Sequence, residues 1–109
     1  HNMKRDVPSG TALTLAESIL EGSKKLRKLN YRKKASNSVR SKNEIGFTSI
    51  RGGDIVGEHT VFFFMDGERI ELTHRATDRK IFSLGALRAA EWIAKKKPGF
   101  YSILDMIGC

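Results

Sequence analysis

The dipeptide Asp66-Gly67 constrains the fold of this chain more than any other part of its sequence. It separates two runs rich in residues that favour β-structure, 58–65 and 68–75. An Asp-Gly pair between two such runs is a strong signal for a hairpin with a two-residue loop, usually a type I′ turn. Residues 68–75 also alternate between apolar and polar side chains. We therefore predict an antiparallel hairpin here.

Three consecutive phenylalanines, Phe62, Phe63 and Phe64, lie in the first strand of this hairpin. Neighbouring side chains of a strand point to opposite faces, so aromatic rings must lie on both faces of the sheet. Either another part of the chain covers the second face, or a second subunit stacks its own sheet on it. Soluble monomers rarely leave an apolar patch of this kind in water.

Helical periodicity precedes and follows this β-rich centre. Apolar residues recur close to a 3.6-residue period from Thr11 to about Leu29, where Gly22 can end the helix early, and again from 84 to 93. Ser83 is a candidate N-cap for the second helix. Residues 47–51 alternate well enough for a further short strand.

An apolar tail with one or two helical turns follows the second helix, at residues 100–107. The order of elements predicts an α+β domain with a largely antiparallel or mixed sheet and helices packed on one face. The other face is then free for oligomerisation. With 109 residues, the chain is expected to be one domain with a modest core.

The net charge of +8 belongs to one segment of the chain. Nine lysines or arginines and no acidic residue lie between Lys24 and Lys42, where Tyr31 is the single aromatic residue. A basic module that binds nucleic acid is one interpretation, but stacking aromatics are missing, and a solvated loop is favoured. The lone Cys109 and the lack of a long apolar run predict a cytoplasmic protein that does not use a membrane.

The first twelve residues carry the candidate chemistry. Ser9 is placed to cap the first helix, Gly10 lets a ligand approach the backbone closely, and Thr11 adds a hydroxyl. The amides of a helix N-terminus attract anions, and His1 and Lys4 can supply positive charge and protons beside them. A small carboxylate or phosphate fits such a site. The alternative is a cap that binds only its own backbone.

Other polar residues are weaker candidates. We expect Asp6 to fix the loop by pairing with Lys4 or Arg5 rather than to react, and Arg79 either to touch a ligand carboxylate or to form a structural ion pair. His74 shares a strand face with apolar residues, which favours a buried or interface histidine. Glu58 and His59 have no metal-ligand spacing with the other acidic residues, so no metal is predicted.

The segment H-x-x-K-x-D-x-P-S-G-T-A at residues 1–12 resembles the signature of the dihydrodipicolinate reductase family. Enzymes of this family belong to the diaminopimelate route to lysine. Further segments agree in order: Glu44-Ile45-Gly46, Arg51-Gly52-Gly53-Asp54-Ile55-Val56-Gly57-Glu58-His59, Gly67-Glu68-Arg69-Ile70-Glu71, Thr73-His74, Arg79, Phe82, Gly85-Ala86-Leu87 and Pro98-Gly99-Phe100-Tyr101-Ser102. The resemblance covers nearly the whole chain, and it assigns residues 1–109 to the C-terminal domain of substrate binding and oligomerisation.

The resemblance implies that Lys4 donates a proton while a nicotinamide, NADH or NADPH, delivers hydride to a cyclic dihydrodipicolinate-type dicarboxylate. It implies that His1 contacts this substrate and that Ser9, Gly10 and Thr11 hold a carboxylate. It also implies a homotetramer built through the sheets. His1 matches the second of the family's paired histidines; the first would precede residue 1.

The same resemblance puts the dinucleotide-binding domain before residue 1. Glycines 52, 53 and 57 do not form a dinucleotide fingerprint, which needs a strand, a glycine turn and a helix in one unit. We therefore predict no cofactor-binding residue in this chain and no turnover by the chain alone. An oligomerisation domain that has lost its site is the remaining alternative.

Overall fold

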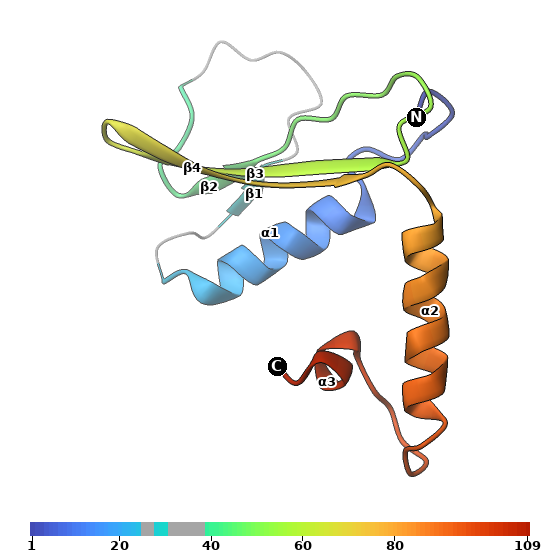
Figure 1. The fold of residues 1–109 in the computed structure, drawn as a ribbon. Coiled ribbons are helices and arrows are strands. Elements are labelled where there is room, and N and C mark those ends of the chain that lie inside the picture. Colours follow the sequence, from blue (N-terminus) through green and yellow to red (C-terminus); the bar gives the residue numbers. More distant parts are fainter. Residues whose placement is uncertain (25–27, 31–38) are drawn as a thin grey trace. The chain divides into compact units, whose positions relative to one another are not determined.

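The computed structural model describes residues 1–24, 28–30 and 39–109, which divide into two compact units, 1–54 and 55–109. The strands form two small sheets, one parallel and one antiparallel, so the chain is α+β with mixed strand pairing, as predicted. The elements of the described residues (Figure 1) are α1 (Gly10–Gly22), β1 (Lys28–Asn30), β2 (Glu44–Gly46), β3 (Gly57–Met65), β4 (Glu68–Ala76), α2 (Lys80–Ile93) and α3 (Ile103–Ile107).

The first helix, α1, begins where the sequence predicts and ends earlier. Its predicted buried side is confirmed, since Ala16 is buried and Thr14 and Glu17 on the other side are exposed. The predicted extension to about Leu29 is wrong, and the alternative of an early end at Gly22 is confirmed. The helix stops at Gly22, a poor helix former, and the next residue is already extended. Leu26, which also carried the helical pattern, lies outside the described residues.

The predicted strand at residues 47–51 is also wrong, because the strand lies a few residues earlier, at β2. Leu29 pairs with Ile45 in a parallel register, and the side-chain amide of Asn30 donates to Glu44 at 2.9 Å. Because β1 is three residues long, β2 pairs with it over three residues. The alternation of apolar and polar residues alone does not show which residues pair with β1.

The hairpin β3–β4 is confirmed, with strand ends within one residue of the prediction. Met65 pairs with Glu68, which leaves Asp66 and Gly67 as the two-residue loop. The type I′ turn is wrong, since that turn needs a positive φ at both loop residues. Only Gly67 has one, at 77°, and no residue other than glycine does among those described.

The two faces of the hairpin differ in chemistry. Residues directly opposite in an antiparallel pair share a face, and the register pairs Phe63 with Ile70 and Phe62 with Glu71. Phe62 and Phe64 stack at 5.7 Å on a mixed face. The other face, which we call the apolar face, carries Val61, Phe63, Met65, Ile70 and Leu72.

This apolar face is open in the single chain. Phe63 keeps 40% of its surface exposed and Leu72 keeps 63%. His59 and His74 face each other on the same side of the hairpin. The predicted grouping of His74 with apolar residues is therefore confirmed, but His74 is exposed in this chain, not buried.

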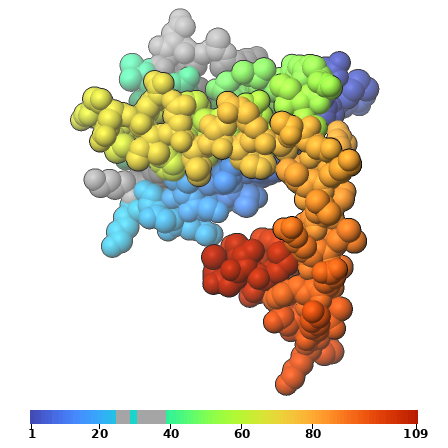
Figure 2. Space-filling view, viewed as in Figure 1, coloured from blue at the N-terminus to red at the C-terminus, as the bar shows by residue number. Residues whose placement is uncertain are grey.

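The second unit continues from β4 into α2. This helix begins at Lys80, whose N–H donates to the carboxylate of Asp78 at 2.8 Å, so the prediction of Ser83 as its N-cap is wrong. The predicted short helix of the tail is confirmed as α3. It opens with a capping box in which Ser102 and Asp105 satisfy each other's backbone N–H groups. Figure 2 shows α3, in red, beside α2, in orange.

Little apolar surface is buried anywhere in the described residues. Ala16 and Ala76, at 3% and 5% exposure, are the only buried apolar residues in these ranges. The core that the described residues form is therefore smaller than the modest core predicted from the sequence. No helix within residues 1–24, 28–30 and 39–109 has the length and apolar character that spanning a membrane requires.

Candidate active site

A short loop ahead of α1 carries Lys4. The N–H of Lys4 donates to the carbonyl of His1 at 3.3 Å, which closes the loop into a turn. The ammonium of Lys4 lies 2.8 Å from the carboxylate of Asp6. The expected pairing of Asp6 is thus confirmed with Lys4 as its partner. Because the Lys4 side chain remains 36% exposed, a ligand from solvent can reach it.

The ion pair lowers the pKa of Asp6. The hydrogen bond from Lys4 holds the pKa of Asp6 below its ordinary value, and the charges of Lys4 and Arg51 act in the same direction. Asp6 is therefore ionised at neutral pH. An ionised carboxylate at 2.8 Å from the Lys4 ammonium can hold it in place.

The N-terminus of α1 has the form that the sequence predicts. Ser9 is buried, and its hydroxyl oxygen accepts the N–H of Ala12 at 3.2 Å. The hydroxyl proton remains available to donate. Gly10 and Thr11 are exposed, and their N–H groups form no hydrogen bond with any described residue. A methyl group on Gly10 would meet open space, so the backbone of Gly10 is open on the side that a Cβ would occupy.

The segment 51–53 holds the Lys4 loop at two points. One terminal nitrogen of Arg51, Nη2, donates to the carbonyl of Asp6 at 2.8 Å, and the other, Nη1, donates to the carbonyl of Ile50 at 2.9 Å. The carbonyl of Gly53 accepts the N–H of Asn2 at 3.1 Å. Arg51 was not among the site residues predicted from the sequence. A contact between residues 45 positions apart leaves no local pattern.

The remaining predicted site residues lie in different units. His1 is partly buried in the Lys4 loop of the first unit, and Arg79 precedes α2 in the second. The carbonyl of Arg79 accepts the N–H of Phe82 at 3.0 Å, while its side chain is exposed. The guanidinium of Arg79 forms no ion pair with a described residue. The expected structural ion pair is therefore not found in these ranges.

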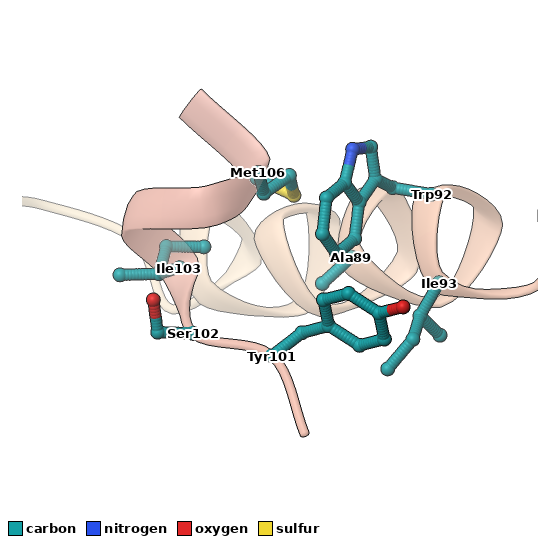
Figure 3. Close-up of a pocket in the computed structure, with 7 residues that line it drawn as sticks. All are labelled: Ala89, Trp92, Ile93, Tyr101, Ser102, Ile103 and Met106. Carbon is teal, nitrogen blue, oxygen red and sulfur yellow. The ribbon is translucent and has the colours of Figure 1, made fainter. Parts of the chain in front are cut away.

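A hollow of about 130 Å³ lies between α2 and the tail (Figure 3). Trp92 and Tyr101 meet edge to face at 5.4 Å, and Lys96 lies over the Trp92 ring. The hydroxyl of Tyr101 donates to the carbonyl of Lys97 at 2.9 Å. The residues that line the hollow include no carboxylate, histidine or lysine. It is lined by Ala89, Trp92, Ile93, Tyr101, Ser102, Ile103 and Met106.

The described residues do not fit a dinucleotide cofactor. The parallel pair β1–β2 joins two three-residue strands, and no glycine turn leads from either of them into a described helix. A dinucleotide fold needs that order of elements. No group of three metal-ligating side chains occurs in these ranges either.

Comparison with known proteins identifies the family. The family described as "Dihydrodipicolinate reductase, C-terminus" matches residues 1–107. The 4-hydroxy-tetrahydrodipicolinate reductase of Myxococcus xanthus (strain DK1622) is 50% identical over 109 residues, which cover 99% of this chain and 40% of the relative. The enzyme of the same name from Aquifex aeolicus (strain VF5) is 51% identical over 108 residues, again 99% and 40%.

The chain spans about 40% of the length of these relatives. The match with the family covers the Lys4 loop, the N-terminus of α1 and the hairpin. The chain belongs to the dihydrodipicolinate reductase C-terminal family.

Proposed function

We propose that this chain is the substrate-binding and oligomerisation domain of a nicotinamide-dependent 4-hydroxy-tetrahydrodipicolinate reductase, a cytoplasmic enzyme of lysine and diaminopimelate biosynthesis. The names of the relatives support the reaction. The observation that carries the site is the position of Lys4. Its ammonium is exposed and fixed by Asp6, in the loop that leads into the free amides of Gly10 and Thr11.

The substrate in this proposal is a cyclic dicarboxylate with a reducible double bond. One carboxylate accepts hydrogen bonds from the N–H groups of Gly10 and Thr11 and from the hydroxyl of Ser9. The positive end of the α1 dipole favours the same charge. The exposed guanidinium of Arg79 supplies two parallel donors for a carboxylate. His1, at the start of the Lys4 loop, contributes a further polar contact.

The reduction adds two hydrogens across one double bond of the ring. A nicotinamide, when bound by another part of the enzyme, supplies one of them as hydride and is oxidised. Lys4 supplies the other as a proton from Nζ and takes one back from water. NADH and NADPH serve this chemistry equally, and nothing in the described residues distinguishes them.

Oligomerisation in this proposal uses the apolar face of the hairpin. Val61, Phe63, Met65, Ile70 and Leu72 are the residues that a second copy would cover. Hydrophobic burial is worth roughly 25 cal/mol per Å². Two such faces therefore gain from stacking, and a tetramer forms when pairs of subunits associate.

Substitution of Lys4 tests the reaction. In the complete enzyme, Lys4→Ala should lower kcat by roughly 10²- to 10⁴-fold, the usual contribution of a positioned proton donor. The affinity for NADH or NADPH, measured by fluorescence titration, should stay unchanged. Lys80→Ala, at an exposed lysine of α2, is the matched control and should keep wild-type turnover. Unchanged turnover in Lys4→Ala would overturn the assignment.

A further inference from the structure

We propose that Arg51 is a positioning residue for the proton donor, acting on Lys4 through Asp6. The inference rests on the proposed role of Lys4 and adds a residue to it. Arg51 does not contact Lys4 directly. It donates to the main-chain carbonyl of Asp6, and the side chain of Asp6 holds the Lys4 ammonium.

The guanidinium of Arg51 is itself fixed. Its Nη1 donates to the carbonyl of Ile50, its Nη2 donates to Asp6, and its Nε is buried. A planar group held at two of its nitrogens cannot rotate without breaking a hydrogen bond. Arg51 therefore presents one defined donor position to Asp6.

The two attachments of the loop lie on either side of Lys4. Before Lys4, the N–H of Asn2 donates a hydrogen bond to the carbonyl of Gly53. After Lys4, the carbonyl of Asp6 accepts a hydrogen bond from Arg51. A loop held at both ends restricts where Lys4 can place Nζ, because four peptide units separate the anchors. Within this loop, the ion pair to Asp6 then selects one direction for the side chain.

Such an arrangement matters for a proton donor because proton transfer needs hydrogen-bond geometry, and a misplacement of about 1 Å can cost roughly 10²-fold in rate. Binding of the substrate carboxylate uses the amides of Gly10 and Thr11, which do not depend on Arg51. Loss of Arg51 should therefore lower kcat and leave KM nearly unchanged.

Arg51→Met in the complete enzyme is the test, because methionine keeps an unbranched apolar stem and removes all donors. We expect kcat to fall by about 10-fold or more and KM to stay within about twofold. Arg88→Met, at an exposed arginine of α2, is the control and should keep wild-type values. Arg51→Lys keeps the charge and one donor group and should recover part of the loss.

A double substitution separates positioning from a general structural effect. If Arg51 acts through Lys4, Arg51→Met should cause no further loss of kcat in the Lys4→Ala background. Equal losses in both backgrounds would overturn the inference, as would an Arg51→Met enzyme with wild-type kcat. If Arg51→Met fails to fold, the same cycle with Arg51→Lys decides between these outcomes.

The outcome also separates this inference from the proposed function. Wild-type turnover in Lys4→Ala contradicts the proposed function itself. A large loss in Lys4→Ala together with an additive loss in Arg51→Met contradicts only the role assigned to Arg51.

Discussion

At the residue scale, Asp6 links the candidate chemistry to its support. Its carboxylate binds Lys4, and its carbonyl binds Arg51. The first contact could be predicted, because a carboxylate two positions after a lysine in a short loop can reach the ammonium. The second could not, because the folding of residues 47–54 brings Arg51 to the loop and no periodicity encodes that path.

The ion pair of Asp6 predicts a pH dependence of stability. The folded-state pKa of Asp6 is depressed, so the pair stabilises the fold above the unfolded-state pKa of about 3.9 and is lost as pH falls through the folded value. Urea unfolding of the wild type and Asp6→Asn should therefore show a constant difference at neutral pH that shrinks below about pH 4.

Asp54→Asn is the control for this experiment, since Asp54 is exposed in the same unit. Its difference from the wild type should stay small at every pH. A difference between the wild type and Asp6→Asn that grows towards acid would contradict a depressed pKa of Asp6 in the folded state.

At the scale of elements, local chemistry predicted the hairpin well and the small parallel sheet poorly. Asp66 and Gly67 specify a loop without help from the rest of the chain, and both strands end within one residue of the prediction. The strand β2 depends on β1, which was predicted as helix. A three-residue strand gains its stability from its partner, so its own alternation carries little information.

Gly67 should be sensitive to substitution. Its φ of 77° lies in the left-handed region, where a side chain is strained even though open space surrounds the position. Gly67→Ala should lower the free energy of unfolding by about 1 kcal/mol. Chemical denaturation checks this value. Gly52→Ala is the control, because Gly52 also faces open space and does not have a left-handed φ; an equal loss in both variants would argue against backbone strain.

At the scale of the whole molecule, many large apolar side chains of the described residues remain exposed. Leu72, Leu87 and Phe100 keep 63%, 62% and 99% of their surface exposed. The sequence predicted amphipathic elements and aromatic rings on both faces of the hairpin. The sequence could not predict what covers these apolar side chains. A hydrophobic pattern indicates that a face is buried, but it does not identify the molecule that buries it.

The apolar face predicts the effect of one charge on assembly. If the complete enzyme forms the proposed tetramer through this face, Phe63→Asp should dissociate it, because stacking would bury an unpaired carboxylate. Phe64→Asp, on the opposite face, is the matched control and should leave the assembly intact. Light scattering measures both masses. A Phe63→Asp enzyme with the same mass as the wild-type assembly would contradict stacking through this face.

The open side of the hairpin also has a kinetic consequence. Ile70 and Leu72 are exposed in the single chain, so under the proposed stacking a subunit gains its final stability only when it meets another copy. Renaturation should then include a bimolecular phase, faster in concentrated solution than in dilute solution. Dilution during recovery from denaturant would slow the return of activity, and the yield would depend on how soon two newly folded hairpins collide.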